Sequence, residues 1–188
     1  MQKIYQKNND ATKIKSGISG CYLLNLTKNI DQRGYFFNIL SKNLFFNKYS
    51  LTSIKQINIS ENKKKGTLRG LHFQSAPYAE KKIVICLKGK IFDIVLDLRK
   101  YSKTFGQYIS FELSEKKNQM LFIPKNCAHG YQTLVDNSLV LYLHSQNYKK
   151  KHDSSINPFD KNLNIKWPIK NKIISNRDKN AKYFKDAL

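Results

Sequence analysis

Short apolar runs recur along the chain from about residue 50 onward, and turn residues separate them. This rhythm is typical of antiparallel sandwiches and barrels, whereas the 3.6-residue period of an amphipathic helix is nearly absent. We therefore expect an all-β fold with one short helical segment near residues 176–186. The expected strands are residues 54–60, 67–74, 81–87, 90–98, 106–114, 119–123, 130–135 and 138–147.

Two of these runs predict different surroundings for their strands. Apolar positions 109, 111 and 113 alternate with polar positions 110 and 112, which predicts one buried face and one wet face. Residues 139–143 are apolar or aromatic without alternation. A strand of that kind needs cover on both faces.

The length of 188 residues suits one domain, since a chain of this size buries roughly 70% of the surface that its unfolded form exposes. The sequence has no internal repeat, no low-complexity linker and no break in composition. We expect a single domain over residues 1–188, with a flexible arm at residues 1–10.

The formal net charge of +21 raises nucleic acid as a partner. However, this charge comes from 30 Lys and only 4 Arg, scattered among many Asn. A nucleic-acid surface more typically interleaves Arg with exposed aromatic residues, because a guanidinium both stacks and forms forked hydrogen bonds. We therefore expect no nucleic-acid partner, although a nucleic-acid-binding barrel remains an alternative that the salt dependence of retention would test.

The cysteines and the N-terminal residues indicate where the protein works. Cys21, Cys86 and Cys127 are odd in number and widely spaced, which predicts neither a disulfide framework nor a zinc knuckle. The first 20 residues contain no apolar run, and no stretch approaches 18 apolar residues. We expect a cytoplasmic protein without a membrane partner.

In a chain that uses Lys at nearly every cationic position, each Arg suggests a specific task, because a planar guanidinium matches phosphate and carboxylate oxygens. Arg33 and Arg69 precede glycines, which let a ligand or a backbone approach closely. Arg99 follows Asp97 by two positions, so a structural ion pair is an equal alternative there.

Two of the four histidines have unusual neighbours. His72 lies in the strand LRGLHFQ, where a period of two places it on the same face as Gln74, and His129 follows the turn in IPKNCAHGY. A catalytic metal in a barrel wants three protein ligands, often starting from a His-x-His pair. Gln74 occupies the place of the second His, so we expect no metal, and a metal-dependent dioxygenase or isomerase is the weaker alternative.

Several multi-residue strings carry a resemblance. They are DQRGYF (31–36), LRGLHFQ (68–74), KGKIFDIVLDLR (88–99), SKTFGQY (102–108), IPKNCAHGY (123–131) and a tail from residues 165–168 to 175–178. In this order, and over about residues 20–180, they resemble the dTDP-4-dehydrorhamnose 3,5-epimerase family. The resemblance implies a cupin-type jelly-roll barrel that works as a homodimer, without cofactor, on a nucleoside-diphosphate 4-keto-6-deoxy sugar.

The implied reaction inverts carbons beside a keto group, which requires a base, an acid on the opposite face and a group that stabilises the enolate. By similarity, His72 is the base and Asp178 holds it, Tyr142 is the proton donor and Lys82 stabilises the enolate. Parity and the motif favour Lys82 over Lys81 for this role. The resemblance also assigns substrate binding to Arg33, Gln56, Asn58, Arg69, Lys82, His129, Asp153 and Arg177.

The sequence departs from the family pattern mainly at positions that concern the nucleoside. Asn38 replaces a usual Glu, Asn147 replaces the first residue of a usual Tyr-Tyr pair, and Leu143 replaces a common Lys. Another nucleotide or another 4-keto sugar is therefore an open alternative, as is inversion at C3 alone. A ketoisomerase of the same fold or a non-catalytic sugar-binding barrel is disfavoured, because all four catalytic residue types are present together.

Overall fold

The computed structural model describes residues 12–15, 17–40 and 53–187. The arm predicted at residues 1–10 lies outside these residues. The described strands are β1 (Thr12–Lys15), β2 (Tyr22–Asn25), β3 (Asn29–Asp31), β4 (Gly34–Phe36), β5 (Gln56–Asn62), β6 (Thr67–Gln74), β7 (Lys82–Lys88), β8 (Lys90–Asp97), β9 (Tyr108–Ser114), β10 (Gln119–Ile123), β11 (Cys127–Thr133), β12 (Ser138–His144), β13 (Asp153–Ser155) and β14 (Ile173–Ile174). The helical elements are the 3₁₀ turn η2 (Lys150–His152), α1 (Asn176–Lys179) and α2 (Phe184–Ala187).

The all-β prediction is confirmed, and most strand boundaries differ from it by three residues or fewer. The single helix predicted near residues 176–186 is wrong in detail, because it is two short helices. Between them, Lys182 forms a parallel bridge to Ile156 and its carbonyl accepts a hydrogen bond from the Asn157 amide, so the backbone there is engaged outside a helix. The strands absent from the prediction, β1–β4, β13 and β14, are two to four residues long and carry little pattern.

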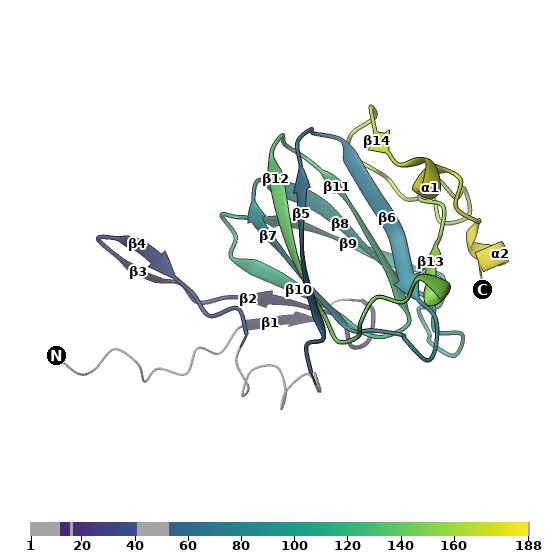
Figure 1. The fold of residues 1–188 in the computed structure, drawn as a ribbon, viewed down its shortest axis with the longest axis horizontal. Coiled ribbons are helices and arrows are strands. Elements are labelled where there is room, and N and C mark those ends of the chain that lie inside the picture. The colour runs from purple at the N-terminus through teal and green to yellow at the C-terminus, as the bar shows by residue number, and fades with distance from the viewer. Residues whose placement is uncertain (1–11, 16, 41–52, 188) are drawn as a thin grey trace.

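Two antiparallel sheets face each other in a jelly-roll barrel (Figure 1). The first sheet has the order β1-β2-β10-β7-β12-β5, and the second has the order β13-β6-β11-β8-β9, with β14 added along β6. The β3–β4 hairpin projects away from the barrel, while α1, α2, β13 and β14 lie on the opposite side, beside β6 (Figure 1).

Apolar side chains form three clusters that account for the layers. The first cluster fills the space between the sheets and includes Val84, Val95 and Val140. The second covers the outer face of the first sheet, and the third lies between the second sheet and the C-terminal segment around Trp167. Strand β12 contributes to the first two clusters, so the prediction that residues 139–143 are covered on both faces is confirmed.

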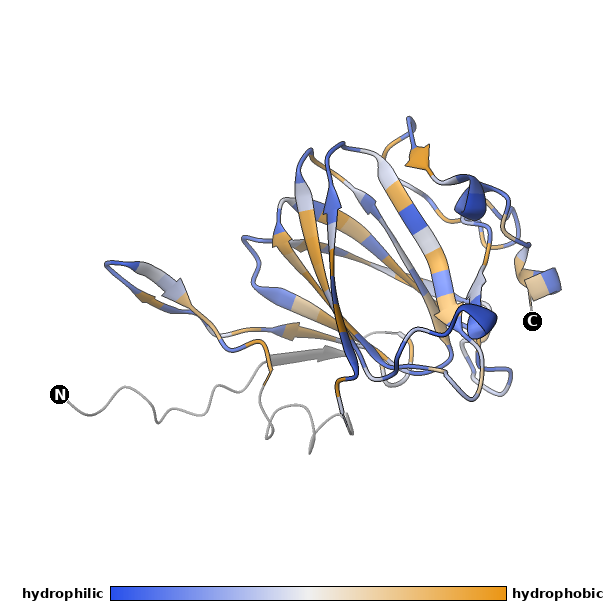
Figure 2. Cartoon of the chain, viewed as in Figure 1, coloured by the Kyte–Doolittle hydropathy of each residue, from blue (hydrophilic) through white to orange (hydrophobic). Residues whose placement is uncertain are grey.

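Every second residue of a strand points to the same face. Along the inward row of β7, these residues change from apolar to polar. In β7, Val84 and Cys86 belong to the inner cluster, so Lys82 lies in the same inward row. Figure 2 shows that hydrophobic and hydrophilic bands alternate along β6. Polar groups therefore meet at one end of the space between the sheets.

A bulge in β6 changes which residues point inward. His72 pairs with His129, but Arg69 pairs with Tyr131, so β6 spends three residues where β11 spends two. Gly70 lies in this irregularity with a φ of +124°, and a Cβ there would come within 2.5 Å of the Gly130 Cα. Only glycine fits both constraints. The bulge lets Arg69 and His72 face the same side although three positions separate them.

Candidate active site

A cleft of about 660 Å³ opens between the two sheets at this polar end. Its lining comes from four strands and the start of a fifth, and it combines charged, aromatic and amide side chains. The lining residues are Ile57, Asn58, Ile59, Ser60, Glu61, Arg69, His72, Lys82, His129, Tyr131, Tyr142 and His144.

His72 and Asp178 are adjacent although 106 positions separate them. The His72 Nε2 lies 2.6 Å from Asp178 Oδ1, and the backbone amide of Gly70 donates to Asp178 Oδ2. Burial raises the pKa of Asp178, but the hydrogen bond and charge of His72 outweigh it, and the net pKa lies below the ordinary value. A carboxylate only accepts hydrogen bonds, so Nε2 carries the hydrogen and Nδ1 is the nitrogen able to take a proton.

Tyr142 faces the cleft from β12, in the sheet opposite His72. Burial raises the pKa of its phenol well above the ordinary value, and the neighbouring Tyr131 adds to the shift. The ring packs edge-on against His129, with 6.0 Å between centroids. A phenol in this state stays protonated at neutral pH, so it can donate a proton but not act as a base.

Lys82 is one of the most buried cations of the described chain. Its ammonium lies 3.2 Å from Glu80 Oε1, and both side chains are less than 10% exposed. The same ammonium lies 3.5 Å from the carbonyl oxygen of His72. Lys81 does not line the cleft. The ammonium of Lys82 therefore bridges the end of β7 and the strand that carries His72.

His129 is buried and paired with a carboxylate of the same sheet. Its Nε2 lies 2.9 and 3.0 Å from the two oxygens of Asp93, whose side chain is fully buried. Burial raises the pKa of Asp93, and the charge and hydrogen bond of His129 oppose that shift. The pair fixes the His129 ring on the floor of the cleft.

Arg69 reaches the cleft from the bulge and is held by an amide. Its Nε donates to Asn62 Oδ1 at 2.8 Å, and the hydroxyl of Tyr131 donates to the same oxygen at 3.2 Å. Because Nε is engaged, the outer guanidinium nitrogens are the ones that can serve a ligand. Arg69 is itself exposed, as a residue that meets an anionic ligand has to be.

The remaining predicted binding residues lie at the mouth of the cleft or outside it. Gln56 Nε2 donates to Asn58 Oδ1 at 3.0 Å. Arg177 and Asp153 form an ion pair of 2.8 Å beside β6. The structure does not bring Arg33 to the cleft, because it lies on the projecting β3–β4 hairpin, where its guanidinium contacts Asp31 at 2.6 Å and is 90% exposed.

The chain was compared with known proteins. The family model of dTDP-4-dehydrorhamnose 3,5-epimerase matches residues 15–186. The chain belongs to the dTDP-4-dehydrorhamnose 3,5-epimerase family. The Shigella flexneri enzyme of that name is 37% identical over 158 residues, which cover 84% of this chain and 87% of the relative.

Two solved structures place the family resemblance in three dimensions. The Legionella pneumophila dTDP-6-deoxy-D-glucose-3,5-epimerase, solved with dTDP-4-keto-L-rhamnose, has a TM-score of 0.87 and 30% identity, covering 92% of each chain. A 3'-monoepimerase from Streptomyces bikiniensis, solved with dTDP-quinovose, has a TM-score of 0.83 and 26% identity, covering 89% of this chain and 85% of that one. Both double and single epimerases therefore share this fold.

Sequence reasoning missed four residues of this epimerase site: Glu80, Asp93, Tyr131 and His144. The positions of Tyr131 and His144 were readable, because each follows a predicted inward residue, His129 or Tyr142, by two positions. Asp93 and Glu80 gave no such signal. Asp93 is a lone carboxylate in an otherwise apolar run, and Glu80 lies in a connecting segment without a period.

The departures from the family pattern lie away from the cleft. Leu143 packs in the apolar cluster outside the first sheet. Asn147 is exposed, and its backbone carbonyl accepts a hydrogen bond from Gln74 Nε2 at 3.2 Å. Asn38 is exposed and accepts a hydrogen bond from the Leu40 amide. None of the three lines the cleft.

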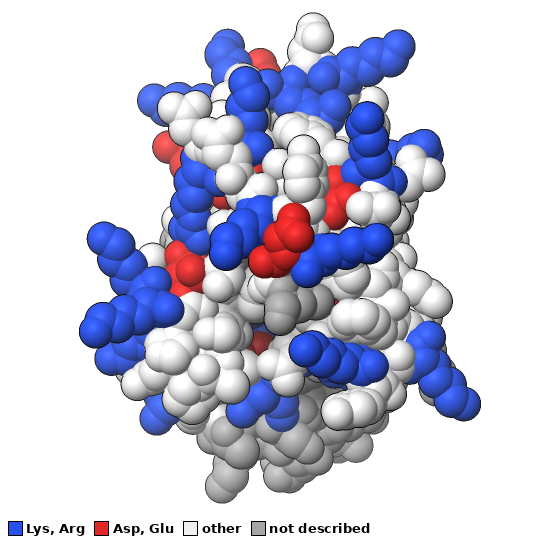
Figure 3. Space-filling view, turned by 90° about the vertical axis from the view of Figure 1, so that its right-hand side faces the viewer, with Lys and Arg blue, Asp and Glu red and all other residues white. Residues whose placement is uncertain are grey.

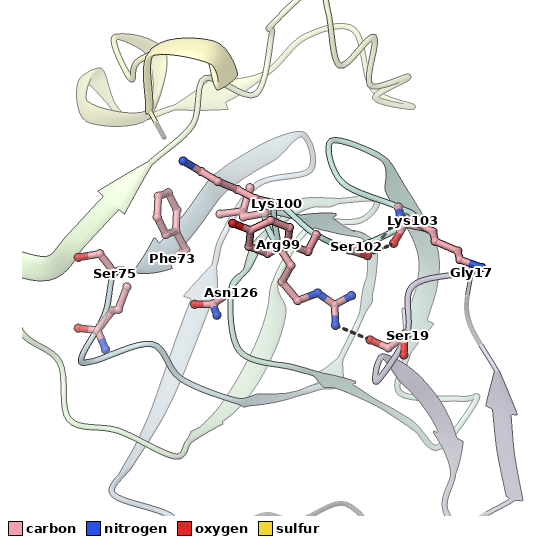
Figure 4. Close-up of a pocket in the computed structure, with 13 residues that line it drawn as sticks. Gly17, Ser19, Phe73, Ser75, Arg99, Lys100, Ser102, Lys103 and Asn126 are labelled. Carbon is pink, nitrogen blue, oxygen red and sulfur yellow. Dashed lines mark hydrogen bonds between the residues drawn. The ribbon is translucent and has the colours of Figure 1, made fainter.

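A second cavity, of about 850 Å³, lies at the end of the barrel where β8 ends and β11 begins. We call it the loop cavity; it is lined by Gly17, Ser19, Phe73, Gln74, Ser75, Leu98, Arg99, Lys100, Tyr101, Ser102, Lys103, Thr104 and Asn126. In Figure 4 the Arg99 guanidinium points toward Ser19, whose carbonyl accepts its hydrogen bond. Its other contact is a forked pair with the buried Asp97, so Arg99 has the structural role.

Two further structural findings bear on partners. Among the described residues, no group of three or more His, Cys, Asp or Glu side chains is arranged to hold a metal ion, and no helix is long and apolar enough to cross a membrane. On the face shown in Figure 3, Lys and Arg side chains are scattered, and Asp and Glu side chains lie among them.

Proposed function

We propose that the protein is a cofactor-independent epimerase of a nucleoside-diphosphate 4-keto-6-deoxy sugar, which inverts C3 and C5 of dTDP-4-dehydro-6-deoxyglucose for L-rhamnose biosynthesis. The observation that carries this proposal is a base and an acid on opposite walls of one cleft: His72 on β6 of the second sheet and Tyr142 on β12 of the first. Inversion removes a proton from one face of a carbon and returns one to the other face, which this arrangement suits.

The base is prepared by its partner. Asp178 accepts a hydrogen bond from Nε2 of His72, which leaves Nδ1 to take the proton beside the keto group. The carboxylate then stabilises the imidazolium that forms, as in other His-carboxylate pairs. The side chain of His72 is 33% exposed, so the ring reaches the cleft while Asp178 remains buried.

The enolate oxygen needs positive charge placed before the reaction starts, because a prearranged cation needs no reorganisation as the charge develops. The ammonium of Lys82 lies on the cleft wall beside His72, and we assign it this role. Arg69, held by Asn62, provides a second cation for the diphosphate. His129, Asn58, Gln56, Asp153 and Arg177 are assigned to the sugar and the nucleotide.

The test is deuterium incorporation. The protein is incubated with dTDP-4-keto-6-deoxyglucose in deuterated water without added metal, and NMR follows the label at C3 and C5. Label at both carbons is expected, and it requires His72. Label at C3 alone assigns the chain to the single epimerases, the class of the Streptomyces monoepimerase. If label enters a 4-keto sugar linked to another nucleotide, but not the dTDP sugar, the departures at Asn38 and Asn147 reflect a different nucleotide specificity.

We further propose that the protein acts as a homodimer in the cytoplasm. Ile57 and Ile59 on β5 are 61% and 64% exposed, and Tyr35 and Phe36 on the projecting hairpin are 59% and 67% exposed. Exposed apolar side chains of this size favour a protein partner, and a second copy would cover them and bring Arg33 toward its cleft. Light scattering at micromolar concentration is expected to give the mass of two chains, and a monomer contradicts the proposal.

A further inference from the structure

Glu80 lies behind the cleft and contacts two of its lining residues at once. Its Oε1 is 3.2 Å from the ammonium of Lys82, and its Oε2 accepts a hydrogen bond from His144 Nδ1 at 2.9 Å. The Glu80 side chain is only 7% exposed and does not itself line the cleft. Any effect of this carboxylate on a substrate therefore passes through Lys82 or His144.

The segment that carries Glu80 is tied to the end of β12. The backbone amide of Lys81 donates to Ser145 Oγ at 2.7 Å, and the amide of Ser145 donates to the carbonyl of Lys81 at 3.0 Å. These two hydrogen bonds hold the segment of Glu80 beside the end of β12, where His144 lies. Burial raises the pKa of Glu80, but the hydrogen bond from His144 and the charge of Lys82 lower it, and the net pKa lies below the ordinary value. Glu80 is a carboxylate, which only accepts hydrogen bonds.

A chain of hydrogen bonds fixes the state of His144 from its other side. The backbone amide of Tyr148, which only donates, bonds Gln56 Oε1 at 2.8 Å. Gln56 therefore presents its NH₂ to Asn58 Oδ1 at 3.0 Å, and Asn58 presents its own NH₂ to His144 Nε2 at 3.3 Å. Nε2 accepts, so it carries no hydrogen.

The two ends of the chain agree on one tautomer. Asn58 requires an unprotonated Nε2, and Glu80 requires a hydrogen on Nδ1, which together describe a neutral His144. A protonated ring would set two donors, Nε2–H and the Asn58 NH₂, against each other. Within the described part of the chain, the negative charge of Glu80 consequently has one cationic partner, Lys82.

We propose that Glu80 is a positioning residue of the epimerase, which fixes the Lys82 ammonium on the cleft wall and, through His144, orients the amide of Asn58. This inference rests on the proposed function, since it assigns Glu80 to the same reaction. One buried carboxylate would then connect the group that stabilises the enolate with a group at the substrate-binding mouth of the cleft.

The first experiment reads the tautomer without any substrate. In protein labelled with ¹⁵N-histidine, long-range ¹H–¹⁵N correlations at neutral pH are expected to show His144 as the neutral Nδ1–H form, with its signals assigned by their loss in His144→Gln. Glu80→Gln is expected to change that pattern, because its amide can replace only one of the two acceptor oxygens. A wild-type His144 in the Nε2–H form would overturn the inference, even if no Glu80 variant folds.

The second experiment measures kcat and KM by deuterium exchange. Glu80→Gln is expected to lower kcat by about 10-fold to 100-fold, by analogy with the loss found in metal sites when the hydrogen-bond partner of a metal ligand is removed. His144→Asn keeps an N–H for Glu80, but it is too short to place an acceptor where Nε2 meets Asn58, so KM should rise more than kcat falls. The matched control is Glu112→Gln on β9, outside the cleft, because Glu112 is also a carboxylate with two side-chain partners, in this case two lysines.

The outcomes separate this inference from the proposed function. Exchange by the wild type together with unchanged kcat and KM in a folded Glu80→Gln would overturn the role of Glu80 and leave the epimerase proposal standing. No exchange by the wild type on any 4-keto nucleotide sugar would overturn the proposed function and with it the role of Glu80, and the tautomer of His144 would still be measurable.

Discussion

The cleft and the loop cavity are hollows of the same barrel, and the buried aspartates beside them, Asp178 and Asp97, have different kinds of partner. In the loop cavity, Asp97 accepts hydrogen bonds from Arg99, Ser102 and Thr104, all within seven positions of it. In the cleft, Asp178 contacts His72 from 106 positions away, and the His72 side chain lines the cleft.

The difference shows that size does not identify a site. The loop cavity is the larger, at about 850 Å³ against about 660 Å³, yet its buried polar groups serve one another. Even Gln74, on its wall, spends both ends of its amide on backbone groups of residues 78, 147 and 149. In the cleft, by contrast, each cationic side chain is held by a protein partner, and its remaining polar atoms can contact a ligand. The contacts of Asp97 join residues close in the sequence and stabilise a loop. The contact of Asp178 joins residues far apart in the sequence and positions a side chain that lines the cleft.

The largest expected effect comes from breaking the long-range pair. His72→Ala or Asp178→Asn should reduce deuterium exchange by about 10²-fold to 10⁴-fold, because general base catalysis of this kind contributes that much. Both variants should keep the fold, as judged by circular dichroism and thermal unfolding. Exchange at the wild-type rate in His72→Ala would remove the assignment of the base.

The corresponding change in the loop cavity, Asp97→Asn, should lower stability and leave activity unchanged. Asp97→Asn breaks a pair whose carboxylate is fully buried, which costs about 3 kcal/mol of unfolding free energy. For a chain of this length that lowers Tm by about 6–12 °C. The kcat of the folded fraction should not change, and Lys100→Ala, in the same loop, should leave both Tm and kcat unaltered. A loss of kcat in folded Asp97→Asn would contradict the division between the two regions.

Tyr142→Phe tests the contribution of one cleft wall while the other wall, with His72, stays intact. Tyr142→Phe removes the proton donor but leaves His72 and Asp178, so inversion should fall by about 10²-fold while exchange on the base's own face falls much less. Comparing the deuterium content of recovered substrate with the amount of inverted product measures the two separately. An equal loss of both would mean that Tyr142 is needed before the proton is removed.

The smallest expected effect is the pH dependence of the stabilisation that Asp97 provides. Arg99, Ser102 and Thr104 outweigh the effect of burial and hold the pKa of Asp97 well below its ordinary value. Its stabilisation is therefore fully present above about pH 4, the unfolded pKa, and is lost as pH falls through the lower folded pKa. The difference in unfolding free energy between wild type and Asp97→Asn, measured in urea from pH 7 to pH 3, should shrink only below about pH 4. A constant difference would show that Asp97 does not act through its charge.

The sequence by itself determined the all-β class, the strands that carry the site and the identity of most of its residues. A period of two is a local property, so parity and the family motif together favoured Lys82 over Lys81, and the family motifs indicated His72 and Tyr142. The family motifs named Asp178 as the partner of His72. Charge composition and the four arginines pointed to a few specific positions, of which Arg69 lies in the cleft and Arg99 does not.

Only the tertiary structure decided how these residues meet. The bulge at Gly70 brings Arg69 and His72 to one side, because close approach to Gly130 depends on the neighbouring strand. The contacts of Glu80 with Lys82 and His144, and of Asp93 with His129, depend on strands that pair across many residues. The hairpin that carries Arg33 forms a separate two-stranded sheet and projects from the barrel, which the sequence did not predict. Periodicity fixes the direction of a side chain along its own strand, and the packing of distant strands decides what that side chain contacts.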